Sequence, residues 1–363
     1  MFPQLKSRQV CFFIIAFVPI IKLFMMSSVI AGFANEDAWL SALFNVILDL
    51  ITLAFVCKAC KNAKSDFITL LEDNLGKTGK NFVLIIYFFY FFLKGIIPIN
   101  EQKDYVELTL YMTQPNLLTF LPILICSFYL CLKELRTLGR VSDILWIITL
   151  VGFTLLMALS ATNADFSAIL PIGARGIDKV LNGSYHALTW FGDIPYIMFF
   201  IGKFKYGKKD TLKIMLSYLF AGIMVVFFVI VFYGVFTSIA FRQQFALTEI
   251  SKYSTIINSI GRFDYIAILL LLFANVFALS FPLYFASKCL QGVFPIKRRW
   301  VFPLATTLAY ACILIFFSEY FYSIEKFILS YGNGFFLILG NLLPCFTVLL
   351  KNKENKLYAV KAR

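Results

Sequence analysis

Four ionisable side chains lie inside stretches that are otherwise apolar enough to cross a lipid bilayer, namely Lys22, Asp49, Lys94 and Asp193. A charge at membrane depth is costly, and it is retained mostly where it serves a binding site or an ion path. These two ammonium and two carboxylate groups could therefore bind a charged solute or an ion. The structural alternative is a buried ion network that only holds helices together.

The neighbours of these charges favour the binding site. With a helical rise of about 1.5 Å per residue, all four groups fall roughly 10 to 15 Å below the outer ends of their segments, in one layer. Pro19 precedes Lys22, and Asp193 stands between Gly192 and Pro195. Such helix breakers free backbone groups that only a cavity or another part of the protein can satisfy.

The composition identifies an integral membrane protein. Of the 363 residues, 60% are hydrophobic and only 15% are charged, which is incompatible with an ordinary soluble domain. We expect a single transmembrane domain over residues 1–363, with approximate repeat halves 1–160 and 180–350. Ten apolar runs are predicted to be membrane helices: 10–30, 38–56, 82–98, 117–132, 144–159, 187–201, 214–236, 265–287, 300–317 and 327–350.

The loop charges predict the orientation. Cytoplasmic loops carry the excess of Lys and Arg. Alternate loops, starting with the N-terminus, hold most of the 33 Lys and Arg residues, so we expect both termini in the cytoplasm. Contact of these loops with anionic membrane lipid accounts for the net charge of +13 without any nucleic acid partner.

Patterns of soluble catalysis are weak. His186 is the single histidine, which excludes His-rich metal sites and argues against a Ser/His/Asp hydrolase. Cys57 and Cys60 have metal-ligand spacing but lack a second Cys pair or a nearby His. We therefore predict no enzyme activity, no metal site and no cofactor.

The two breaks fall in the first span of each half. Interrupted helices at matching positions of two five-span halves are typical of inverted-repeat secondary transporters, which bind solute near the midplane. Asp49 shares a helix face with Asn45 and could pair with Lys94. The candidate ligand-binding residues are Pro19, Lys22, Gly192, Asp193 and Tyr196, and the candidate ion or charge network comprises Asn45, Asp49, Lys94 and Glu101.

Several motifs, in their order and spacing, resemble the B subunit of spore germinant receptors, within the amino acid-polyamine-organocation superfamily. The resemblance covers nearly the whole chain. It rests on Asn35-Glu36-Asp37-Ala38-Trp39-Leu40, residues 101–115, Leu138-Gly139-Arg140-Val141-Ser142-Asp143, Asp165-Phe166-Ser167-Ala168-Ile169-Leu170-Pro171 with Gly183, Phe191-Gly192-Asp193, and Ile260-Gly261-Arg262-Phe263-Asp264.

The resemblance implies a ten-helix fold of the leucine-transporter type with broken helices one and six. It also implies a sensor of a nutrient, often an amino acid, in the inner membrane of a dormant spore. Such proteins act beside an A subunit and a lipoprotein C subunit and couple ligand binding to ion release. This chain departs from the family at Pro19-Ile20-Ile21-Lys22, where small residues are usual, and at Asp193, where Glu is common.

These observations predict a germinant-receptor B subunit that performs no bond chemistry. Lys22 could hold a ligand carboxylate or occupy a cation site. One alternative is a proton-coupled amino acid permease, because the same scaffold serves both functions. Another is a scaffold whose cavity is vestigial.

Overall fold

The computed structural model describes residues 5–109, 117–252, 264–294, 296, 298–317 and 320–351. Within these residues the chain is helical, and its only strand-like feature is a parallel bridge between Leu5 and Phe204. Residues 110–115 and 260–263, which belong to two of the family-like motifs, lie outside this description.

The first half begins with a helix interrupted near its middle. α1 (Ser7–Phe17) ends just before Pro19, a short 3-10 turn covers Ile20–Lys22, and α2 (Met26–Ala34) resumes the helix. Four longer helices follow: α3 (Ala38–Asn62), α4 (Phe67–Thr109), α5 (Leu117–Cys131) and α6 (Leu135–Ser160). α4 is bent at Gly76, whose φ of 70° interrupts the helical geometry.

The second half also begins with a broken helix. α7 (Ile177–Ala187) is separated from α8 (Ile194–Met198) by residues 188–193. The further elements are α9 (Asp210–Phe236), α10 (Ala246–Lys252), α12 (Asp264–Val293), α13 (Val301–Phe316), α14 (Phe321–Tyr331), α15 (Asn333–Leu337), a π-helical turn (Ile338–Leu342) and α16 (Leu343–Cys345).

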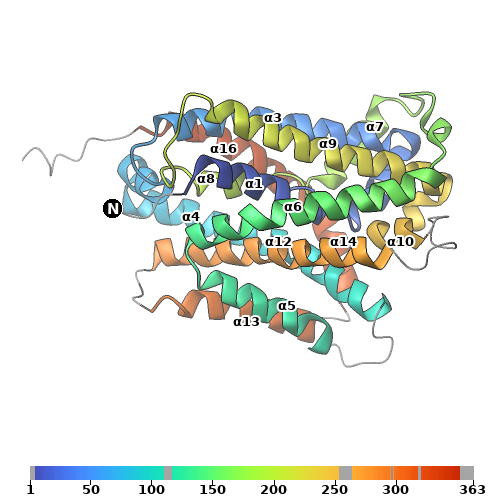
Figure 1. Cartoon of the computed structure of the whole chain (residues 1–363). Helices are drawn as coiled ribbons and strands as arrows, with labels where there is room; N and C mark the ends of the chain where they lie inside the picture. The colour runs from blue at the N-terminus through green and yellow to red at the C-terminus, as the bar shows by residue number, and fades with distance from the viewer. Residues whose placement is uncertain are drawn as a thin grey trace, which may run out of the picture.

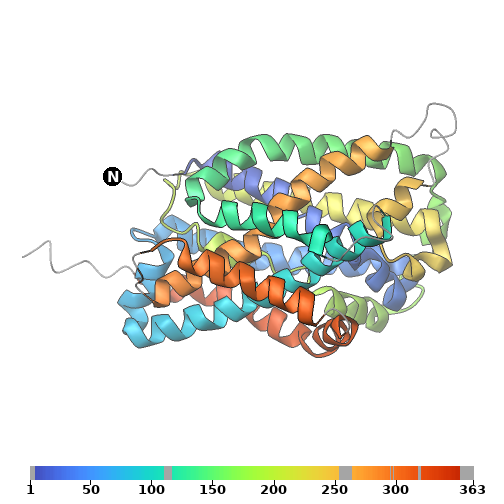
Figure 2. The same ribbon diagram turned by 90° about the horizontal axis from the view of Figure 1, so that it is seen from below.

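The long helices pack as a bundle whose axes run from left to right in Figure 1. α12 packs along α4, α5 and α6, and α3 packs along α9. α5 and α13 lie side by side at one edge of the bundle, as both views show (Figures 1 and 2). The N-terminal end of the bundle is the end at the left of Figure 1, and α7 and α10 lie at the far end.

Within the described ranges, five helical stretches are long and apolar enough to cross a membrane: Met26–Asn62, Phe67–Val106, Leu135–Asn163, Asp210–Arg242 and Ile266–Val293. The bent pair Val301–Phe316 and Phe321–Tyr331 raises the number to as many as six. The break in the predicted first span leaves α1 too short to meet this criterion, whereas α2 continues into α3 within Met26–Asn62, and the two pieces of the predicted sixth span, α7 and α8, are both too short. The number of ten spans therefore stays a prediction.

Candidate functional site

The break in the first helix exposes a backbone carbonyl that a lysine binds. α1 stops at Phe17, and Pro19 has no N–H with which to continue the hydrogen-bond ladder. Lys22, one turn later, turns its ammonium group back and donates to the carbonyl oxygen of Val18 at 2.8 Å. Its side chain is fully buried. The lysine thus satisfies a carbonyl that the break leaves free.

The break in the sixth helix has the same arrangement. Gly192, which lies between the end of α7 and the start of α8, has a φ of 73°, in the left-handed region that favours glycine. Lys94 of α4 donates to the carbonyl oxygen of Phe191. The hydroxyl of Tyr90, one turn earlier on α4, donates to the carbonyl oxygen of Gly192 at 2.5 Å. α4 therefore holds the backbone of this break.

Asp193 joins the two lysines. Its Oδ2 lies 2.5 Å from Nζ of Lys22, and its Oδ1 lies 3.4 Å from Nζ of Lys94. Both lysines and the aspartate are at most 1% exposed. The Lys22 ammonium also lies 5.0 Å from the ring centroid of Phe191. One carboxylate therefore connects the broken first helix, the broken sixth helix and α4.

Asp49 of α3 is held from three other elements by hydrogen bonds. Its Oδ2 accepts from the backbone N–H of Gly192 at 3.1 Å and from the hydroxyl of Tyr218 at 2.5 Å. Its Oδ1 accepts from the side-chain amide of Asn341 at 2.6 Å. The pairing of Asp49 with Lys94 considered from the sequence is wrong, because Lys94 forms its ion pair with Asp193. We call Lys22, Asp49, Lys94 and Asp193 the charge cluster.

The π-helical turn approaches this cluster closely. Gly340 lies in the turn, and a Cβ at that position would be 2.9 Å from the hydroxyl of Tyr90 and 3.1 Å from Cα of Gly192. Any other residue here would have to push Tyr90 or the backbone of Gly192 away. Asn341, the next residue, is thereby brought to Asp49. π turns are rare and occur frequently at functional sites.

The remaining predicted residues have separate contacts. Asn45 exchanges two hydrogen bonds with Ser184, at 2.9 and 2.8 Å, and so ties α3 to α7. Oε1 of Glu101 accepts from the indole N–H of Trp190 at 2.9 Å. Tyr196 is buried, and its hydroxyl has no hydrogen-bond partner among the residues of the described ranges. These contacts connect neither Asn45 nor Glu101 directly to the charge cluster.

Sequence reasoning missed three polar groups that complete the site: the hydroxyls of Tyr90 and Tyr218 and the amide of Asn341. All three lie in apolar runs of the sequence. Asn341 could have been found by the argument applied to the charges, since an amide in a membrane helix also needs a partner. The tyrosines carry no comparable signal, because the chain contains 18 of them.

The charge cluster is neutral as a whole and lies at the junction of two helix breaks. Each buried charge has a partner, as its desolvation requires. The arrangement offers donors and acceptors to a polar solute when the internal pairs separate. Within the part of the chain that the structure describes, no group of three or more His, Cys, Asp or Glu side chains could hold a metal ion.

The fold and the two breaks define a helical membrane protein of the leucine-transporter type, as expected. The chain superposes on MhsT, solved in complex with L-phenylalanine, with a TM-score of 0.65 and 12% identity, over 96% of this chain and 89% of MhsT. It matches a mutant of the Eremococcus coleocola manganese transporter with a TM-score of 0.58 and 14% identity, over 96% and 81% of the two chains. At these identities the likeness establishes the fold alone.

The sequence comparisons identify the family. The model of the family described as spore germination protein matches residues 4–324, and the chain belongs to this family. Spore germination protein XB of Bacillus anthracis is 23% identical over 355 residues, covering 95% of this chain and 98% of that protein. Spore germination protein YndE of Bacillus subtilis is 22% identical over 180 residues, about half (49%) of each chain. The predicted resemblance is confirmed at the level of the family.

Proposed function

We propose that this chain is the B subunit of a nutrient germinant receptor. It binds a small molecule, an amino acid in our proposal, at the two helix breaks and couples binding to ion release and spore germination. The observation that carries the proposal is the position of Asp193, which connects both breaks through Lys22 and Lys94. A solute that replaces one of these pairs would change how the two broken helices are held together.

In this proposal the protein lies in the spore inner membrane with both termini in the cytoplasm, and it acts beside A and C receptor subunits. Membership of the spore germination protein family supports the role in germination. The function is binding and conformational change, with no bond chemistry. The N-terminal end of the bundle would then face the cytoplasm, as the excess of Lys and Arg in alternate loops indicates.

A proton-coupled amino acid permease is the second candidate, because the structural neighbours are transporters. Uptake by the purified chain in liposomes distinguishes the two functions. With labelled alanine as the probe and an imposed proton gradient, we expect no accumulation above that of protein-free liposomes. Robust gradient-driven accumulation would overturn the receptor in favour of the permease.

Lys22→Met tests how the site is used. If Lys22 holds a ligand carboxylate, the nutrient concentration for half-maximal germination should rise about tenfold to a hundredfold, equivalent to about 1.4 to 2.8 kcal/mol. If its ammonium occupies a cation site, the response should instead become dependent on sodium or pH with little change in that concentration. Lys80→Met is the matched control. It also removes a lysine from an ion pair, but Lys80 pairs with Glu72 within α4 and not with the charge cluster. An unchanged response of Lys22→Met, at equal protein level, would remove Lys22 from the site.

A further inference from the structure

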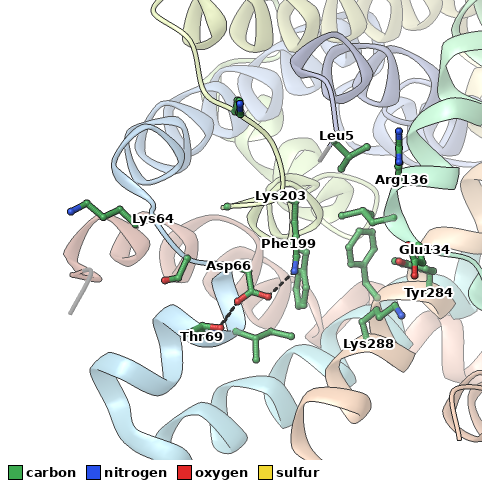
Figure 3. Close-up of a pocket in the computed structure, with 16 residues that line it drawn as sticks. Leu5, Lys64, Asp66, Thr69, Glu134, Arg136, Phe199, Lys203, Tyr284 and Lys288 are labelled. Atoms are coloured by element: carbon green, nitrogen blue, oxygen red, sulfur yellow. Dashed lines mark hydrogen bonds and ion pairs between the residues drawn. The ribbon is translucent and has the colours of Figure 1, made fainter. Parts of the chain in front are cut away.

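A cavity of about 960 Å³ opens at the N-terminal end of the bundle, separate from the charge cluster (Figure 3). Five parts of the chain form its wall: Leu5 before α1, residues 64–69 around the start of α4, residues 134–136 at the start of α6, residues 199–205 after α8, and residues 284–288 of α12. The cavity cannot be recognised from the sequence, because most of these segments are loops and helix ends far apart in the chain.

The floor of the cavity is aromatic. Phe199 and Phe285 lie with their ring centroids 5.2 Å apart, and both are buried. Phe285 contacts Tyr196 at 5.4 Å between centroids, and Tyr196 follows Asp193 on the short helix α8. None of the four residues of the charge cluster lines the cavity.

The rim of the cavity is basic. Two of the lining residues are acidic. Asp66 accepts from Lys203, which also lines the cavity, at 2.7 Å, and Glu134 lies 3.4 Å from Arg299, which does not. Five lining residues are basic, namely Lys64, Arg136, Lys203, Lys205 and Lys288. Positive charge is therefore in excess around the opening.

Lys288 extends this charge toward the floor. Its Nζ donates to the side-chain oxygen of Gln291 at 3.0 Å and lies 5.2 Å from the ring centroid of Tyr284, and both partners are neutral. The carboxylate of Glu134 attracts it without forming an ion pair. Arg136 forms no ion pair with any residue in the described ranges. A cleft lined by charge of one sign between apolar walls concentrates the potential inside it.

We propose that this cavity binds an anion, by a phosphate or carboxylate group held on Lys288 with its apolar part on Phe199 and Phe285, while Arg136 adds positive charge at the rim. Charge-assisted hydrogen bonds of this kind are among the strongest that a protein offers. The bound anion would connect α12 and the floor residue Phe199, which follows α8. Its occupancy would oppose movement of that segment away from α12, whatever nutrient the charge cluster receives.

The anionic group could belong to a soluble molecule or to a phospholipid head group, and one experiment distinguishes the two. The purified chain is placed in nanodiscs of phosphatidylcholine, and binding of labelled pyrophosphate is measured by equilibrium dialysis. A second series replaces pyrophosphate with short-chain phosphatidylglycerol. Lys288→Met should weaken binding about tenfold, equivalent to about 1.4 kcal/mol. Arg136→Gln, which removes a charge at the rim, should weaken binding less. Lys208→Gln, which removes an exposed charge at the same end but outside the cavity, should leave binding unchanged.

Two controls show whether a loss of binding comes from misfolding. The melting temperature of each variant is measured without the anion, and binding is also measured for the conservative variant Lys288→Arg. The conservative variant should bind like the wild type. Pyrophosphate binding that depends on Lys288 and Arg136 supports a soluble anion, and phosphatidylglycerol binding alone with the same dependence supports a lipid head group at the same site. Binding of neither probe, or equal binding by Lys288→Met and Lys208→Gln, would overturn the proposal.

Discussion

The charge cluster and the cavity at the N-terminal end both contain lysines, but their surroundings are opposite. Lys22 and Lys94 are at most 1% exposed, and each binds Asp193 and a backbone carbonyl. Lys288 has neutral hydrogen-bond and ring partners at the wall of an open cavity. A buried charge without a partner costs several kcal/mol, whereas a charge that is solvated by water needs no partner in the protein. Substitutions in the cluster should therefore change stability first, and substitutions in the cavity should change binding first.

Asp193→Asn should have the largest effect, because it leaves two buried ammonium groups without a counter-charge. Breaking one buried pair costs about 3 to 5 kcal/mol. We expect a marked fall in the melting temperature of the detergent-solubilised protein. Fluorescence-detected size-exclusion chromatography of heated samples measures this temperature. The nutrient response of spores that carry the variant should be lost as well. Normal sensitivity at matched protein level would contradict the placement of Asp193 at the centre of the site.

The double variant Asp193→Asn with Lys22→Met sharpens this test, since it also removes the closer of the two ammonium groups. It should recover part of the lost stability. The control double variant, Asp193→Asn with Lys80→Met, removes a lysine of α4 that does not contact Asp193. It should recover none of the lost stability. Equal melting temperatures for the two double variants would show that the cost of Asp193→Asn does not come from an unpaired Lys22.

Asp49→Asn should have an intermediate effect. The carboxylate accepts three hydrogen bonds, and an amide in its place would turn a donor toward one of those donors. Hydrogen bonds to a charged group contribute about 1.5 to 3 kcal/mol. Addition of Lys94→Met should not restore the melting temperature, because Lys94 pairs with Asp193. Restoration would show that Asp49 and Lys94 do meet in the membrane.

Asp66→Asn, at the rim of the cavity, should have the smallest effect. Burial alone would raise the pKa of Asp66, but hydrogen bonds from Lys203 and Thr69 lower it below its ordinary value of 3.8. A carboxylate with a lowered folded pKa stabilises the protein above its unfolded pKa and loses this contribution as the pH falls through the folded value. An exposed pair contributes about 0 to 1 kcal/mol. The melting temperatures of wild type and variant should differ slightly at pH 7 and converge below about pH 4.

The sequence predicted the two helix breaks and the buried charges because their causes are local. Proline and glycine act on their own backbone, and a charge in an apolar run is visible without a fold. The partner of Lys94 could not be predicted from the sequence, because both Asp49 and Asp193 were candidates. Only the packing of α3, α4 and the break in the sixth helix selects Asp193. Asn45 and Glu101 show the same limit, because membership of an apolar span does not establish contact with the cluster.

The π-helical turn Ile338–Leu342 has a consequence for helix register. A π turn accommodates one residue more than an α turn, and each residue of an α-helix advances about 1.5 Å and turns about 100°. Deletion of a single residue from this turn would let the helix rewind and would rotate the side chains beyond it by that angle relative to those before it. Asn341 could then no longer present its amide to Asp49 while Gly340 stays against Gly192. The number of residues in one helical turn, and not only their identity, thus determines whether the last helix completes the site.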